Sequence, residues 1–218
     1  MKRILIALFV ALAASAMSVA GARAQCVGVA GYGGPNPIPG ISCASEPSVD
    51  TYAATSVALV PVAAGATDFF CIAGSATKVV RIQRIRVHGT ATTIVNVPLL
   101  VMKHASLNTG AASATGTQIP IPYAFDSTDA APTATTRAWI TANPTITDAA
   151  PGIIASNNLQ LNLPAAVGTA VIFDWDSRNF SEAATLRSAS QEVCLNLNTT
   201  AVVAGLLYTS VTWTEAAQ

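Results

Sequence analysis

The chain has 218 residues, of which 51% are hydrophobic and only 10% are charged, with 11 basic and 11 acidic side chains. This balance argues against a nucleic-acid-binding protein, which would carry an excess of Lys and Arg to neutralise phosphates. The length suits one domain with an extension, and a core of that size folds without a structural metal.

Residues 1–24 predict a cleaved secretory signal peptide. A basic Lys2-Arg3 precedes an apolar run, and the segment ends in the small-residue site Ala22-Arg23-Ala24, so cleavage should expose Gln25. The apolar run is shorter than the roughly 20 residues of a membrane-spanning helix, and no later stretch is long enough either. We therefore expect a secreted or periplasmic protein with no membrane insertion. The mature chain keeps eight basic and eleven acidic side chains, a net charge near −3.

A Gly/Pro-rich segment, residues 25–50, follows the signal. It contains too many helix and strand breakers for regular structure and predicts a loop or linker before a domain spanning residues 51–218.

All four cysteines lie in the mature chain, and an even number in an exported protein predicts two disulfides. Three pairings are open. We favour Cys26 with Cys43, which are close in sequence, and Cys71 with Cys194, which lie in two strand-like segments. A metal site is disfavoured because there is no Cys-x-x-Cys spacing and both histidines are remote in the sequence.

The domain reads as short β-strands separated by turn residues, with no helix-length segment of 3.6-residue period. Ten strands are predicted: 57–62, 69–73, 79–88, 93–102, 118–123, 134–142, 153–163, 170–176, 192–198 and 206–214. Strands at this spacing predict an all-β protein, an antiparallel β-sandwich of jelly-roll type.

Two segments show the strand pattern most clearly. In 80–88 the apolar–polar alternation slips by one position at Gln83-Arg84, which is the mark of a β-bulge. In 207–214 one face carries Leu207, Thr209, Val211 and Trp213 and the other carries Tyr208 and hydroxyl residues, so one face of the strand should be buried and the other wet.

Three connections are long: 106–117, 125–133 and 143–152. They consist mainly of small and turn-forming residues. Long loops on a rigid β scaffold often carry binding surfaces, and the alternative is that they are only connections.

The tetrapeptide Ser75-Ala76-Thr77-Lys78 matches the Ser-x-x-Lys motif of penicillin-binding enzymes. Here it lies between two predicted strands, and neither Ser-Asp-Asn nor Lys-Thr-Gly follows. We interpret it as a turn.

Asp174 and Asp176 flank Trp175, so on a strand their carboxylates would face the same side, about 7 Å apart. That spacing would suit an inverting glycosidase. A calcium site that adds Asn179 is a second alternative, since calcium takes carboxylate and amide oxygens. The expected arrangement is a solvated strand end in which Arg178 is the partner of a carboxylate.

The other chemistry-bearing residues do not converge in sequence. His88 and His104 have no third ligand that would complete a zinc site. Four basic residues are concentrated around one predicted strand. We interpret them as a solvated face that discourages aggregation at the sheet edge, rather than as a patch that binds an anionic partner. They are Lys78, Arg81, Arg84 and Arg86.

The large aromatic residues lie on different strands and are expected in the core or at its rim rather than in a sugar-stacking platform. They are Tyr123, Trp139, Trp175 and Trp213.

Four phrases between residues 78 and 215 carry a resemblance. They are KVVRIQRIRVHGTAT at 78–92, NTG at 108–110, ANPT at 142–145 and VTWTE at 211–215. In these phrases the chain resembles small jelly-roll proteins of bacteriophages and prophages, described as hypothetical, capsid-decorating or fibre-like. The resemblance implies a non-enzymatic structural or surface-binding jelly roll. The export signal and the four cysteines depart from that family, so an exported cellular role is as consistent as a virion role.

The resulting hypothesis is an exported, non-enzymatic β-sandwich that acts as a structural or surface-binding module and self-assembles or binds a surface or particle. It needs no cofactor and no metal. The rival hypothesis is a secreted carbohydrate-active enzyme that uses Asp174 and Asp176. An enzyme would place these carboxylates in a concave cleft lined by an aromatic residue such as Trp175, whereas a module would leave them on a convex edge.

Overall fold

The computed structural model describes residues 49–60, 67–112, 114–163, 172–179, 183–198 and 205–218. The predicted signal peptide lies outside these residues, and so do Cys26 and Cys43. Within the described residues the protein is all-β, with eleven strands and two short 3-10 helices. The all-β prediction is therefore confirmed.

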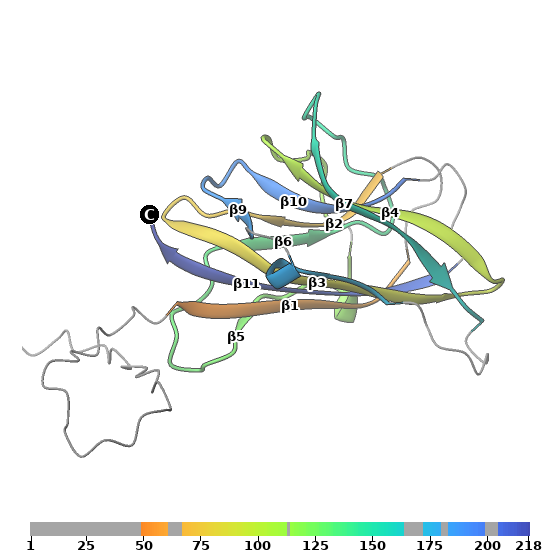
Figure 1. Ribbon diagram of the computed structural model, residues 1–218, viewed down its shortest axis with the longest axis horizontal. Helices are drawn as coiled ribbons and strands as arrows, with labels where there is room; N and C mark the ends of the chain where they lie inside the picture. Colours follow the sequence, from red (N-terminus) through yellow and green to blue (C-terminus); the bar gives the residue numbers. More distant parts are fainter. Residues whose placement is uncertain (1–48, 61–66, 113, 164–171, 180–182, 199–204) are drawn as a thin grey trace, which may run out of the picture. The chain divides into compact units, whose positions relative to one another are not determined.

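Two antiparallel sheets form the layers of a sandwich (Figure 1). Sheet A has the strand order β5-β1-β11-β3-β8, with β9 also paired to β3. Its strands are β1 (Asp50–Leu59), β3 (Lys78–Ala91), β5 (Tyr123–Ala124), β8 (Phe173–Asp176), β9 (Ala184–Leu186) and β11 (Gly205–Ala217).

Sheet B has the order β6-β2-β10-β4-β7. Its strands are β2 (Thr67–Ala73), β4 (Val95–His104), β6 (Thr135–Ala138), β7 (Gly152–Leu161) and β10 (Glu192–Leu197). Four consecutive strands of sheet A, in the order 1-11-3-8, correspond to four of sheet B in the order 2-10-4-7, so the chain repeatedly crosses from one sheet to the other. This nested order is that of a jelly roll.

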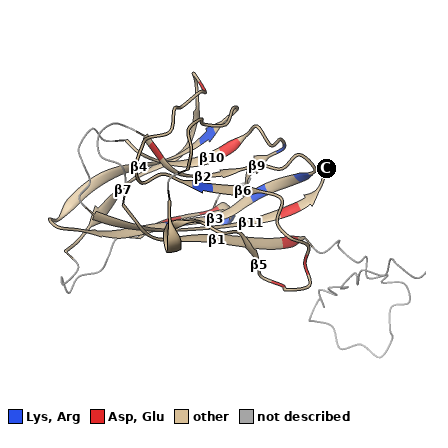
Figure 2. Cartoon of the chain, turned by 180° about the vertical axis from the view of Figure 1, so that it is seen from behind, with Lys and Arg blue, Asp and Glu red and all other residues tan. Residues whose placement is uncertain are grey.

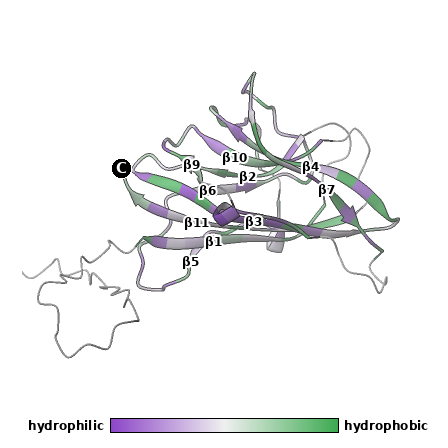
Figure 3. Cartoon of the chain, in the orientation of Figure 1, coloured by the Kyte–Doolittle hydropathy of each residue, from purple (hydrophilic) through white to green (hydrophobic). Residues whose placement is uncertain are grey.

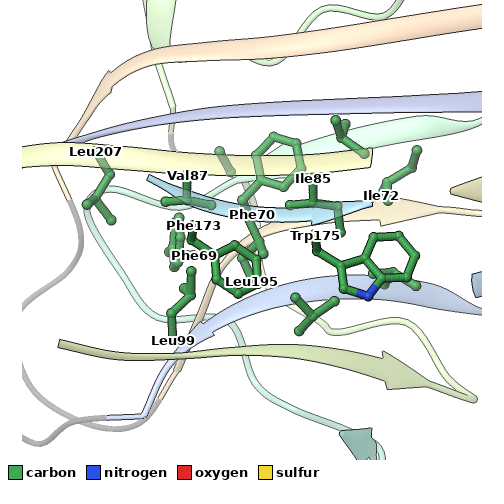
Figure 4. Close-up of a cluster of buried hydrophobic side chains, with 14 of the residues drawn as sticks. Phe69, Phe70, Ile72, Ile85, Val87, Leu99, Phe173, Trp175, Leu195 and Leu207 are labelled. Atoms are coloured by element: carbon green, nitrogen blue, oxygen red, sulfur yellow. The ribbon is translucent and has the colours of Figure 1, made fainter. Parts of the chain in front are cut away.

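The core lies between the sheets and is filled from both of them. Figure 4 shows side chains of sheet A, including Ile85 and Val87, facing side chains of sheet B such as Phe70 and Leu195. Each strand contributes alternate residues, as the stripes of hydropathy along β3 and β11 show (Figure 3).

The predicted bulge in β3 is confirmed. Thr212 of β11 pairs with Arg84 and the next residue, Trp213, pairs with Ile82, so Gln83 is the extra residue. The bulge keeps Ile82 and Ile85 on the buried face although three positions separate them.

One predicted strand is wrong, and two stretches of strand were not predicted. Residues 118–123 are not a strand: the 3-10 helix η1 (Gly116–Gln118) ends at the first of them, and only Tyr123 and Ala124 pair with β1. Pro120 and Pro122 remove two backbone donors, which prevents a longer ladder. The first half of β1 and all of β9 were not predicted, because their Ala and Thr residues carry too little apolar alternation to be recognised without their partner strands.

Candidate functional site

Asp174 and Asp176 lie on β8 and point away from the core, whereas Trp175 between them is 4% exposed and packs inside it. The carboxylates and the indole are therefore on opposite faces of sheet A. Trp175 therefore cannot line a cleft together with these two carboxylates, as the glycosidase hypothesis requires.

Both carboxylates are held by arginines. Asp174 accepts a hydrogen bond from Nε of Arg84 at 2.8 Å and lies 3.5 Å from Nε of Arg86 on the neighbouring strand β3. Asp176 accepts hydrogen bonds from the backbone N–H and Nε of Arg178 at 2.9 and 3.0 Å. The expected pairing with Arg178 is thus present, in the 3-10 helix η2 (Ser177–Asn179) that follows the strand.

These arginines favour the ionised carboxylates. The hydrogen bond from Arg84 lowers the pKa of Asp174, and those from Arg178 lower the pKa of Asp176 to about 2. A glycosidase needs one carboxyl group with a raised pKa to act as general acid, which is the opposite arrangement. The lone pairs that calcium would take are also engaged by the arginines.

The Ser-x-x-Lys tetrapeptide is a turn, as predicted. Oγ of Ser75 accepts hydrogen bonds from the backbone N–H groups of Thr77 and Lys78, both at 3.1 Å. The ammonium of Lys78 instead lies 3.6 Å from Asp50, so it forms an ion pair across sheet A. The basic residues around β3 include three with acidic partners: Lys78 with Asp50, and Arg84 and Arg86 with Asp174.

The three tryptophans are buried, at most 4% exposed: Trp175 and Trp213 lie in the main core, and Trp139 lies in a separate cluster with Cys71 and Cys194. The fourth aromatic, Tyr123, is half exposed on the edge strand β5. The four residues do not form a common platform.

Cys71 and Cys194 form a disulfide between neighbouring strands β2 and β10, where they are directly opposite each other. The predicted pairing of these two cysteines is confirmed. The residues on either side of each cysteine point into the main core; they are Phe70, Ile72, Val193 and Leu195. Because side chains alternate along a strand, the two cysteines face the other side of sheet B.

A buried polar network surrounds this disulfide, and sequence reasoning did not foresee it. The carboxylate of Asp68 accepts hydrogen bonds from the side-chain amides of Asn108 and Asn196 at 2.6 and 2.7 Å. Its Oδ2 also lies 3.1 Å from Nε2 of His104. The amide of Asn108 is 3.7 Å from each sulfur. The two histidines differ in burial. His104 is fully buried beside Asp68, whereas His88 is exposed on sheet A and stacks on Tyr208.

A second acidic group completes the network. Glu192 is fully buried and is paired with Arg137, while its other oxygen accepts the backbone N–H of Asn108 at 2.6 Å. Arg137 also lies over the ring of Trp139, 5.2 Å from its centroid. Each buried acid is thus matched by a cation or by amide donors, which makes its burial tolerable.

This network could hold a metal only if the disulfide were open. Asp68, Cys71 and Cys194 bring ligand atoms within 4.8 Å of one another. Metals bind thiolates, and both sulfurs are used in the disulfide. With the disulfide formed, neither sulfur is a thiolate that could bind a metal.

The loops 106–117 and 143–152 are joined to each other. Thr109 and Thr145 exchange backbone hydrogen bonds at 3.0 and 2.9 Å. The carboxylate of Asp148 accepts the N–H of Ala105 at 2.6 Å. Together with the buried Asn108, these contacts fix the two loops against the network on sheet B.

The most distinctive surface feature lies beside the remaining loop, 125–133. Four apolar side chains alternate along residues 119–125, which lead into this loop, and are 44, 67, 50 and 62% exposed. They are Ile119, Ile121, Tyr123 and Phe125, and we call them the edge stripe. The rings of Tyr123 and Phe125 are 6.0 Å apart.

The segment that carries the edge stripe is held along β1 at both ends. Gln118 donates from Nε2 to the carbonyl of Ala58 at 2.9 Å, and the N–H of Phe125 donates to the carbonyl of Thr51 at 2.9 Å. The stripe is therefore a fixed surface of the sandwich. The sequence predicts a strand over 118–123, but nothing in the sequence indicated that these side chains would be exposed.

No family model, curated protein or solved structure matches the chain. Among the described residues no helix is long and apolar enough to cross a membrane. The disulfide Cys71–Cys194 is compatible with an oxidising compartment.

Proposed function

We propose that the protein is an exported, non-enzymatic structural module that associates with a second copy of itself through the edge stripe. The observation that carries this proposal is the row of four large apolar side chains held open to solvent along one edge of sheet A. Scattered apolar residues are normal on protein surfaces, whereas a contiguous group marks an interaction surface.

The charges around the stripe favour an identical partner. From Ala105 to Phe125 the chain contains no charged residue, and charges are sparse on the strands in general (Figure 2). Two copies can therefore bring residues 119–125 together without like-charge repulsion within the stripe itself; the nearest acids in sequence, Asp126 and Asp129, follow it in the loop. A twofold axis would place the stripe against itself and bury it in both copies at once.

The backbone chemistry indicates how the copies would meet. Pro120 and Pro122 have no N–H, so this edge does not extend a β-ladder into a neighbour. Contact must come from the side chains. Its strength should then depend on apolar area and shape and only weakly on salt.

Two further arguments support a module over an enzyme. The jelly-roll order agrees with the resemblance to phage proteins that decorate capsids or form fibres, although fold alone does not define function. At the rival site, Asp174 and Asp176 are paired with arginines on the face opposite Trp175. The export step itself predicts that the intact mass of the released protein corresponds to a chain that starts at Gln25.

The test compares matched apolar-to-lysine substitutions. Ile121→Lys and Phe125→Lys should each weaken self-association about tenfold or more, because each places an ammonium in an apolar contact. Ile94→Lys and Ile153→Lys are the controls, since these residues are 60 and 61% exposed but lie outside the stripe. Equal effects of all four substitutions on the mass measured by light scattering would refute the proposal.

A further inference from the structure

A cavity of about 420 Å³ lies on another part of the sandwich, between the two sheets. Sheet B contributes Lys103 and Ile154 to its lining, and sheet A contributes Trp175 and Thr185; Arg187 and Gln191 complete it beyond β9. The volume is in the range of small-molecule sites. This cavity is separate from the edge stripe, which is on the β1 side of sheet A.

Lys103 points between the sheets because it is paired with Val193, whose side chain is in the core. Its Nζ donates to the carbonyl of Thr185 at 2.8 Å. An ammonium has three N–H donors, so this bond fixes the group and leaves two donors for a ligand.

Arg187 is fixed by its main chain. Its N–H donates to Oε1 of Gln191 at 2.8 Å, and its carbonyl accepts from Nε2 of Gln218 at 3.0 Å. No hydrogen bond joins its guanidinium to another described residue. Because Gln191 uses its oxygen in this contact, the group that it can offer a ligand is its NH₂.

The chemistry of the lining is therefore one-sided. The ammonium of Lys103, the guanidinium of Arg187 and the amide NH₂ of Gln191 are all donors, and no described lining residue is acidic. Trp175 and Ile154 supply an apolar wall. A ligand that fits this set has an anionic acceptor group on a compact body that can lie against an indole.

We propose that this cavity binds a small organic carboxylate, with the carboxylate held by Lys103 and Arg187 and the body packed against Trp175 and Ile154. A planar carboxylate matches the two parallel donors of a guanidinium. The body is either a sugar ring, as in a uronic acid, or an aromatic ring.

The experiment titrates the full mature protein with D-glucuronate and with benzoate, each at up to about 10 mM, where a ligand of millimolar dissociation constant would be largely bound. Glucose and benzyl alcohol are the neutral counterparts, and inorganic phosphate is the competing anion. Binding is followed by calorimetry and by tryptophan fluorescence, with Trp175→Phe to assign the signal.

We expect at least one carboxylate to bind and its neutral counterpart not to bind; which one binds identifies the ring. Arg187→Gln and Lys103→Met should each weaken binding about tenfold or more, whereas Arg84→Gln, on the outer face of sheet A, should not. Arg187 is exposed, so its variant is expected to fold even if the Lys103 variant does not. The proposal is overturned if neither carboxylate binds, if the neutral compounds bind equally, if phosphate alone binds, or if Arg84→Gln has the same effect as Arg187→Gln.

Discussion

Oδ2 of Asp68 lies 3.1 Å from Nε2 of His104, and neither side chain has any exposed surface. The two residues belong to strands β2 and β4, which are separated by β10. Burial alone would lower the pKa of His104, but the nearby carboxylate of Asp68, aided by the charges of Glu192 and Asp148, outweighs it and raises the pKa above 6.5. In the folded protein His104 therefore binds its proton more tightly than in the unfolded chain.

This relationship predicts that His104 stabilises the fold most at low pH. Its contribution is fully present below the unfolded pKa of about 6.5 and is lost as pH rises through the higher folded pKa. Urea-unfolding midpoints measured from mildly acidic to mildly alkaline pH should fall over this window. His104→Gln should remove that slope, whatever its effect on stability at one pH. An unchanged slope in the variant would contradict the assignment.

Glu215 should show the opposite pH dependence. Although burial raises the pKa of its carboxyl group, hydrogen bonds from Thr133, Ala134 and Trp213 lower it below 4.5 overall. The carboxylate accepts the Nε1–H of Trp213 at 3.0 Å and the N–H of Ala134 at 2.9 Å. Its contribution is thus present above pH 4.5 and is lost as pH falls through the lower folded pKa.

We expect Glu215→Gln to lower the free energy of unfolding at neutral pH by roughly 2–4 kcal/mol, because an amide cannot accept all of these bonds and its NH₂ would face other donors. The control is Asp129→Asn, in the loop 125–133 whose Thr133 is bound by Glu215. It should change the free energy of unfolding by less than about 0.5 kcal/mol. Chemical unfolding monitored by tryptophan fluorescence measures both. A Glu215 variant as stable as the control would show that the carboxylate does not anchor the loop.

The disulfide Cys71–Cys194 joins residues 123 positions apart. Loop-closure entropy then gives an upper value of about 5 kcal/mol for its contribution. The double variant Cys71→Ser, Cys194→Ser should lose roughly 3–5 kcal/mol of unfolding free energy. Peptide mapping without reduction should find this pair and, separately, Cys26 joined to Cys43. A cross-link between Cys71 and Cys26 would be inconsistent with the fold.

Asp174→Asn removes ion pairs that are partly exposed, so it should cost no more than about 1 kcal/mol. It should leave self-association unchanged, as should Asp176→Asn. The same variants test the rival hypothesis through polysaccharide hydrolysis. If the wild type hydrolysed a polysaccharide and both variants abolished that activity, the enzyme hypothesis would replace the hypothesis of a structural module.

Much of the framework could be predicted from local pattern. In β3 the alternation and its slip at Gln83 are written in adjacent residues, and the jelly-roll class follows from the spacing of such strands. By contrast, Asp68 and His104 are brought together by pairing across three strands, which no local period encodes. The segment 119–125 shows the limit of alternation itself: it indicates which residues share a face, but not whether that face is covered.

The central claim is that the sandwich pairs with itself through the edge stripe. Its most direct test is the mass in solution of the unaltered mature protein, measured by light scattering over a range of concentrations. We predict that the mass approaches twice that of one chain as concentration rises and that high salt changes the midpoint little. A mass of one chain at every concentration would contradict the account.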